Sequence, residues 1–64
     1  MHFRKAIARI TSWRDAQMLS NRGLAELAGL AESRVRGIDR ASWNPTLRTL
    51  ETLEKIVPEA WRAK

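Results

Sequence analysis

The 64-residue sequence contains no cysteine and no tyrosine, and it has only three glycines, two prolines and one histidine, His2. The lack of cysteine excludes disulfides and thiolate metal sites, and a single imidazole does not make a metal site alone. No apolar run is long enough to cross a membrane, and no signal-peptide core is visible. We therefore expect one cytoplasmic domain, residues 1–64, with no metal and no other cofactor.

The residue groupings that catalysis requires are also missing. The sequence has no nucleophile beside a base, no glycine-rich phosphate loop and no carboxylate pair in a pocket-forming setting, so we do not expect an enzyme. Nothing points to a small-molecule ligand. The net charge is +5, which favours a polyanion as the partner. The basic residues are spread over every segment, and this argues against binding at a membrane surface.

What the sequence has in abundance is Leu, Ala, Arg and Glu, which form helices readily. Apolar and polar residues do not alternate with period two, so we expect no strands. The first helix is predicted from Phe3 to Met18, since apolar residues recur there at spacings of three and four. Its inward face comprises Phe3, Ile7, Ile10, Trp13 and Gln17. The expected fold class is all-α, a compact bundle of four to five short helices.

Two short helices follow around a glycine. Ser20 is the expected N-cap of a helix over residues 21–28, and Gly29 is its expected left-handed stop. A third helix is predicted from Glu32 or Ser33 to Ala41. Leu24, Ala25 and Ala28 of the second helix, and Val35 and Ile38 of the third, are expected to face inward.

The last third of the chain predicts one more long helix and a final turn. Asn44-Pro45 cannot continue a helix, and Thr46 is the expected cap of the next one, over residues 47–57. Pro58 ends that helix, and a short turn over residues 59–62 is expected to place Trp61 against the bundle. The apolar stripe of the long helix comprises Leu47, Leu50, Leu53, Ile56 and Val57.

Two short helices separated by a turn that contains glycine are typical of a helix-turn-helix. The second helix of such a unit enters the major groove of DNA, where Arg contacts guanine bidentately and Glu accepts from cytosine. The predicted base-reading residues are Glu32, Ser33, Arg34, Arg36 and Gly37. The alternative is that these residues form an ordinary solvated face and that Gly37 only weakens the helix.

The order of these features resembles the Cro and phage-repressor class of helix-turn-helix domains, the Xre family, over residues 14–57. The residues that carry the resemblance are Leu19-Ser20, Leu24-Ala25, Gly29-Leu30, Val35, Ile38-Asp39-Arg40 and Pro45-Thr46-Leu47. The chain departs from the pattern at Ala31, where the family usually has a capping Ser or Thr. The resemblance implies a lambda repressor-like bundle that binds operator DNA as a dimer, in a bacterial or phage-encoded regulator on the nucleoid.

The resemblance also implies roles for individual residues. Members of the family pair an Arg late in the first helix with an acid at the end of the third, and Arg14 and Asp39 match these positions. A bidentate pair would hold the two helices together, whereas the alternative is two solvated charges. The predicted phosphate-binding residues are Ser20, Asn21, Arg22, Arg40, Ser42 and Asn44.

The apolar residues near the end of the chain leave two interpretations open. Trp43, Leu53, Val57 and Trp61 form either a surface for a second copy of the chain or a lid on its own core. The function expected from the sequence is sequence-specific binding of double-stranded DNA by a small transcriptional regulator, with the helix at about 32–41 in the major groove. The alternative is a protein-interaction module, such as an antitoxin or an accessory regulatory subunit.

Overall fold

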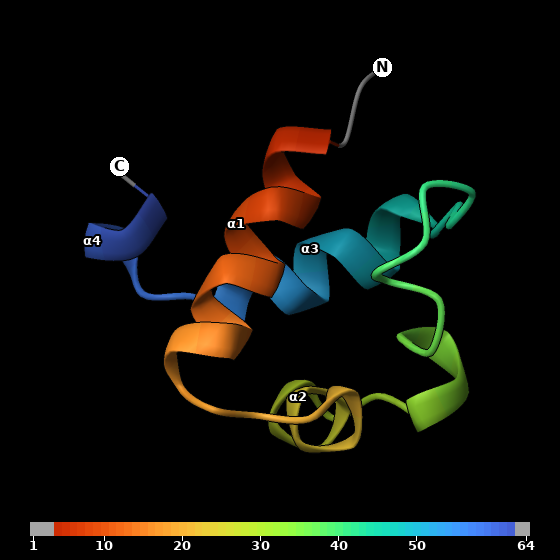
Figure 1. Cartoon of the computed structure of the whole chain (residues 1–64), viewed down its shortest axis with the longest axis horizontal. Helices are drawn as coiled ribbons and strands as arrows, with labels where there is room; N and C mark the ends of the chain where they lie inside the picture. The colour runs from red at the N-terminus through yellow and green to blue at the C-terminus, as the bar shows by residue number, and fades with distance from the viewer. Residues whose placement is uncertain (1–3, 63–64) are drawn as a thin grey trace.

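Helices make up the fold of residues 4–62, the part of the chain described by the computed structural model (Figure 1). In chain order they are α1 (Arg4–Ala16), α2 (Asn21–Ala28), the 3₁₀ helix η1 (Glu32–Arg34), α3 (Leu47–Ile56) and α4 (Glu59–Arg62). No strand occurs in this range, so the predicted all-α class is confirmed for it. His2 and Phe3 lie outside the described residues.

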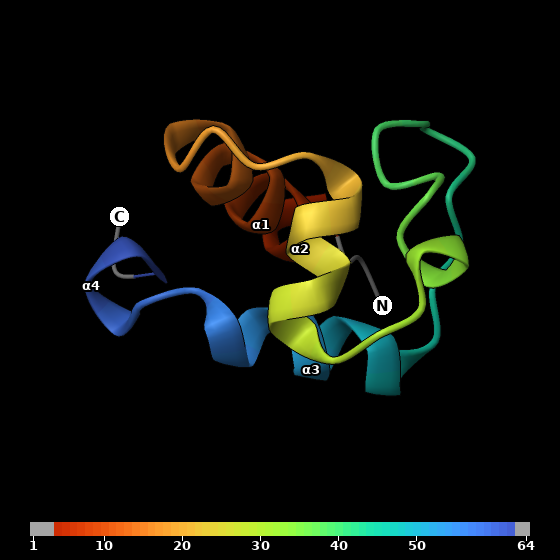
Figure 2. The same cartoon turned by 90° about the horizontal axis from the view of Figure 1, so that it is seen from below.

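The helices enclose one small core. α1 and α3 lie against each other, α2 packs on α3, and α4 returns to α1 (Figures 1 and 2). The Cα radius of gyration is 10.6 Å. A folded domain of this length is expected to have a value of about 10.7 Å. The fully buried apolar residues come from α1, α2, α3 and the chain between α2 and α3: Ile10, Leu24, Ala25, Val35, Ile38, Leu50, Leu53 and Val57.

The first helix ends two residues earlier than predicted. After Ala16 the amide of Leu19 donates to the carbonyl of Arg14 at 3.0 Å, and the amide of Met18 donates to that of Asp15, also at 3.0 Å. This is a Schellman ending, which needs a left-handed residue at Met18. Met18 has φ 58° and is 92% exposed. Gln17 is exposed as well, so its predicted place on the core face is wrong.

The second helix has the predicted bounds and the predicted ends. The Ser20 hydroxyl accepts from the amide of Gly23 at 3.0 Å. At the other end Gly29 is left-handed, with φ 71°, and the amide of Leu30 donates to the carbonyl of Ala25. The serine cap and the glycine stop set the two ends of α2 locally, while burial of Leu24 and Ala25 stabilises the helix itself.

The third helix is where the prediction is wrong. An α-helix was expected up to Ala41, but the structure has only the three residues of η1, followed by turns. The amides of Val35, Ile38 and Arg40 each donate to the carbonyl three residues earlier. Two local causes oppose an α-helix. Ala31 has no side-chain cap to offer, and Gly37 costs about 1 kcal/mol relative to Ala inside a helix.

The last two helices follow the prediction closely. The Thr46 hydroxyl accepts from the amide of Thr49 at 3.2 Å and so caps α3, which ends at Ile56, one residue short of the predicted end. The predicted turn after Pro58 is α4. Leu47 was expected on the buried stripe and is 51% exposed, because it lies in the first turn of α3 at the edge of the bundle.

Replacing Met18 by glycine is expected to stabilise the protein by about 1 kcal/mol. A residue with a Cβ costs roughly 1–2 kcal/mol in the left-handed conformation, and glycine gives back part of that gain through its greater freedom when unfolded. The exposed Met18 side chain contributes little packing that would be lost. Urea denaturation of the Met18→Gly variant measures the difference.

Gly29→Ala is the matched control, because Gly29 has the same conformation at the end of α2 and a Cβ there would meet nothing within 4 Å. This substitution should destabilise the protein by about 1 kcal/mol. If both variants shift stability in the same direction, backbone conformation is not what decides these two positions.

Candidate nucleic-acid interface

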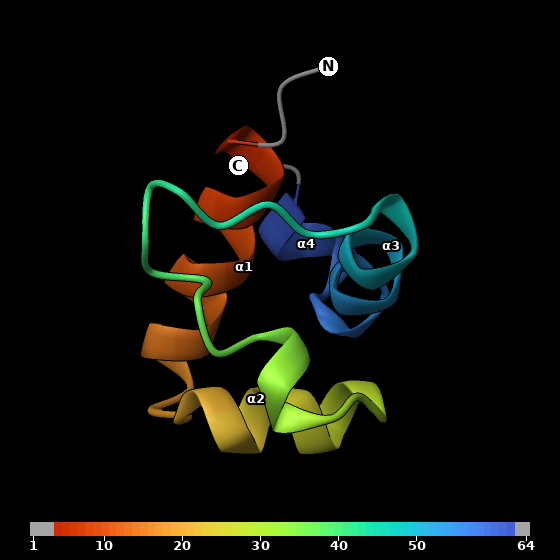
Figure 3. The same ribbon diagram turned by 90° about the vertical axis from the view of Figure 1, so that its right-hand side faces the viewer.

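The residues predicted to read bases lie on an exposed stretch of chain, residues 32–44, which we call the outer segment. Figure 3 shows it leaving the end of α2, rising beside α1 and crossing to the start of α3. Glu32, Ser33, Arg34 and Arg36 are all exposed. Val35 and Ile38 are buried in the core, as predicted, so the segment is anchored from beneath by two apolar side chains.

Gly37 is the exception among the predicted base-reading residues. A Cβ built on it would lie 3.0 Å from Cδ1 of Trp43, so the indole ring rests directly on the glycine backbone. The sequence left open whether Gly37 allows DNA to approach or only weakens a helix. The structure gives a third answer, because Gly37 provides the space in which the Trp43 ring packs.

A bidentate ion pair joins the outer segment to α1, as the sequence predicted. Nη1 of Arg14 donates to Oδ2 of Asp39 at 3.0 Å, and Nη2 donates to Oδ1 at 2.9 Å. Nε of Arg14 also donates to Asp15, at 2.9 Å. The Arg14 side chain is only 10% exposed, whereas that of Asp39 is 57% exposed. The buried guanidinium is therefore neutralised by two carboxylates on its solvent side.

The ion pair shifts the pKa of both Arg14 and Asp39. Hydrogen bonds from Arg14 hold the pKa of the Asp39 carboxyl below its ordinary value of 3.8. The bond to Asp39 likewise raises the pKa of Arg14 above its ordinary value. Each partner stabilises the charged form of the other, so the pair is fully ionised at neutral pH.

Asn21 belongs to this cluster. Its side-chain oxygen accepts from Nη1 of Arg14 at 2.7 Å, and its nitrogen lies 3.4 Å from Oδ2 of Asp39. The prediction gave Asn21 a hydrogen bond to a DNA phosphate, but the structure uses the side chain to join α2 to α1 and the outer segment. Ser20 caps α2, which the sequence also predicted.

Two arginines have a structural role that those of the outer segment lack. Arg9 pairs with Glu54 on α3, and Arg14 pairs with Asp39, so both stabilise the fold. In contrast, the exposed Arg34, Arg36 and Arg40 form no ion pair within the described part of the chain.

The other predicted phosphate-binding residues are also accessible. Arg22 is exposed and lies 3.4 Å from Glu26 in a solvated pair. Such a pair contributes little to stability, and so it leaves the guanidinium available. Ser42 and Asn44 are exposed at the end of the outer segment.

The surface predicted for a second copy of the chain is largely internal. Leu53 and Val57 are 0% and 1% exposed, so their assignment to a dimer surface is wrong. A chain of this length has few apolar residues, and it buries Leu53 of α3 and Val57 directly after α3 in its own core. Trp43 and Trp61 are half-buried and pack on the same core, which favours the alternative of a lid.

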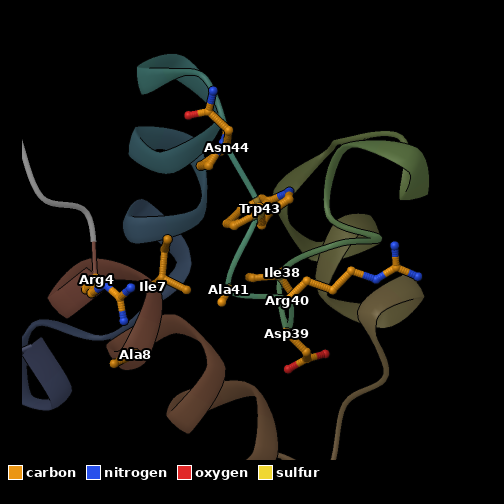
Figure 4. Close-up of a pocket in the computed structure, with 10 residues that line it drawn as sticks. Arg4, Ile7, Ala8, Ile38, Asp39, Arg40, Ala41, Trp43 and Asn44 are labelled. Carbon is orange, nitrogen blue, oxygen red and sulfur yellow. The ribbon is translucent and has the colours of Figure 1, made fainter.

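One feature of the site has no signal in the sequence. An open groove of about 560 Å³ lies between the first half of α1 and the second half of the outer segment (Figure 4). We call it the α1 groove, and its main lining residues are Arg4, Ile7, Ala8, Ile38, Trp43 and Asn44. Its two walls are about thirty residues apart in the chain, and only the fold brings them together.

Other kinds of site are not evident among the described residues. No group of three His, Cys, Asp or Glu side chains in residues 4–62 is arranged to hold a metal ion. Within the same range, no helix has the length and apolar character needed to cross a bilayer.

Removing the Asp39 carboxylate should destabilise the fold. We expect Asp39→Ala to cost about 1–2 kcal/mol at neutral pH, because it leaves the buried Arg14 with Asp15 as its only carboxylate and detaches the outer segment from α1. The loss should lower the melting temperature by several degrees. Glu51→Ala, at an exposed acid on α3 with no ion pair among the described residues, is the control and should change little.

The stability that Asp39 contributes should also depend on pH in one direction. Because its pKa is lower in the folded state than the ordinary value of 3.8, the contribution is complete above about pH 4 and is lost as the pH falls through the folded-state pKa. The difference in unfolding free energy between wild type and Asp39→Ala should therefore shrink on acidification below pH 4. A difference that stays constant down to pH 2 would contradict this assignment.

Comparison of the chain with protein-family models, with curated proteins and with solved structures finds no match. The resemblance to the Cro and phage-repressor class therefore stays a prediction from the residues that carry it.

Proposed function

We propose that this chain binds double-stranded DNA through the outer segment and acts as a small transcriptional regulator. The observation that carries the proposal is the exposure of Arg34, Arg36 and Arg40, three guanidinium groups without an ionic partner among the described residues. An excess of free guanidinium groups on one stretch of a +5 chain favours a polyanion.

The manner of binding differs from the one expected from the sequence. A long α-helix would lie in the major groove and present one face to it. Here a single 3₁₀ turn, η1, is the only helical part of the outer segment. Arg34 is the last residue of that turn and Arg36 follows two residues later, so these two side chains are the best placed to contact base edges. Arg40 and Asn44 come later and are assigned to the phosphate backbone.

The proposal includes sequence selectivity, since arginine grips guanine through two hydrogen bonds. Phosphate contacts from Arg22 and Arg40 would supply most of the affinity and a strong dependence on salt. The twofold arrangement implied by the family resemblance belongs to the proposal as well, but Leu53 and Val57 cannot supply its interface. Selection of bound duplexes from a random pool returns both the preferred site and its symmetry.

Arg36→Ala tests the role of the outer segment directly. We expect it to weaken binding to the selected duplex by about 1–3 kcal/mol and to relax the preference at one base pair. Arg36 is exposed and unpaired within the described residues, so the melting temperature should not change. Fluorescence anisotropy of a labelled duplex measures the affinity at several salt concentrations.

Lys55→Ala is the control for charge alone, because Lys55 is an exposed cation in the last turn of α3, at the end away from the outer segment (Figure 1). It should leave the affinity nearly unchanged. If Arg36→Ala weakens all duplexes equally, Arg36 contacts phosphate and not a base. If the two variants lose affinity equally, or if neither binds differently from wild type, the outer segment is not the DNA-binding element.

A further inference from the structure

The α1 groove combines an apolar interior with a cation at its edge. Ile7 and Ala8 on one wall and Trp43 and Ala41 on the other supply the apolar surface, with buried Ile38 beneath them. The volume of about 560 Å³ falls in the range of small-molecule sites. Arg40 and Asn44, assigned above to phosphate, lie on its rim, but its apolar walls have no part in the proposed DNA binding. The occupant of the groove is therefore inferred from the chemistry of those walls.

Three charged residues line the groove, Arg4, Asp39 and Arg40, and they differ in where their charged groups lie. Arg4 is exposed, forms no ion pair among the described residues, and has its guanidinium beside Ile7 (Figure 4). The carboxylate of Asp39 and the guanidinium of Arg40 point away from Trp43 in the same view. Asp39 is in any case neutralised by Arg14. Of the two arginines that line the groove in the described part of the chain, Arg4 therefore presents its charge to the apolar wall, whereas Arg40 extends away from it.

The aromatic wall is held in place. The Trp43 ring rests on the backbone of Gly37, with Cδ1 at 3.0 Å from an ideal Cβ there, and it packs against the core. A ring that is already fixed loses little conformational freedom when a ligand binds. A second aromatic ring would gain offset stacking or edge contacts with it beyond the area it buries.

We propose that the α1 groove binds a small planar aromatic molecule that carries one negative charge. Its ring lies against Trp43 and Ile7, and its anionic group pairs with Arg4. The charge complementarity at Arg4 selects the anion, and the fixed indole selects the flat apolar body. This inference goes beyond DNA binding and does not depend on it.

The test uses 1-anilinonaphthalene-8-sulfonate, an aromatic anion, and N-phenyl-1-naphthylamine, its neutral analogue. Fluorescence titration of the full chain should show one sulfonate probe bound per chain. Arg4→Gln should weaken that probe at least fivefold, because a charge-assisted contact is lost. The same variant should bind the neutral analogue as wild type does. Lys55→Gln removes an equal charge away from the groove and should change neither affinity.

The position of the bound probe is read from the indole N–H resonances. The sulfonate probe should shift the Trp43 resonance and leave that of Trp61 in place, since Trp61 does not line the groove but a separate and smaller hollow. Ala41→Phe, which places a bulky ring at an exposed position that lines the groove and not the Trp61 hollow, should reduce the affinity for both probes. Melting curves confirm that each variant is folded.

Three results would overturn the proposal. The first is an affinity for the sulfonate probe that is equal in wild type and Arg4→Gln. The second is a shift centred on Trp61, which would place the probe elsewhere. The third is a Trp43 resonance that moves with protein concentration when no probe is present, because a second copy of the chain would then occupy the groove.

Discussion

The bidentate pair of Arg14 and Asp39 is the polar contact that ties the outer segment to α1, while buried Val35 and Ile38 anchor the same segment on the core. Backbone hydrogen bonds do little to fix this segment, because each of its turns spans only three residues and none extends into an α-helix. Asp39 attaches its middle to α1, and Asn21 extends the same cluster to the start of α2. A buried guanidinium without a partner would be costly, so the arginine and the segment require each other.

The sequence favours an α-helix up to Ala41, whereas the structure has η1 followed by turns. The difference arises because local signals are weak there and tertiary packing decides the conformation. Serine at 20, glycine at 29 and threonine at 46 specify the ends of their helices through a single hydrogen bond or a single backbone angle, and those ends were predicted correctly. Between Glu32 and Ala41 no residue acts in that way. Gly37 weakens a helix there, and the packing of Trp43 on that glycine then favours turns.

In the candidate site, too, local features could be predicted from the sequence and features that depend on tertiary contacts could not. Arg34 and Arg36 flank buried Val35, and Arg40 comes two residues after buried Ile38. Once Val35 and Ile38 are assigned to the core, this spacing is enough to predict that the three arginines are exposed. The bond from Arg14 to Asn21 was missed, because a side-chain amide gives no sign in the sequence of which neighbour it will meet. The α1 groove was missed because its walls are distant in the chain. The sequence left two roles open for Leu53 and Val57, a dimer surface or a lid on the core. Both are buried, because a core this small needs them inside the chain.

The division of arginines connects the fold to its proposed partner. Carboxylates are placed where a guanidinium is partly buried, with Glu54 beside Arg9 and Asp39 beside Arg14. Pairing there offsets the cost of removing charge from water. The arginines of the outer segment are exposed and form no ion pair among the described residues, although Glu32 and Asp39 lie on the same segment. Ion pairs at such exposed positions would add little to stability. Exposed cations without an ion pair also occur on α1 and α3, but Arg34, Arg36 and Arg40 lie close together in the chain. Their position is explained if that segment meets an anion supplied from outside, and a DNA backbone supplies many at the spacing of successive phosphates.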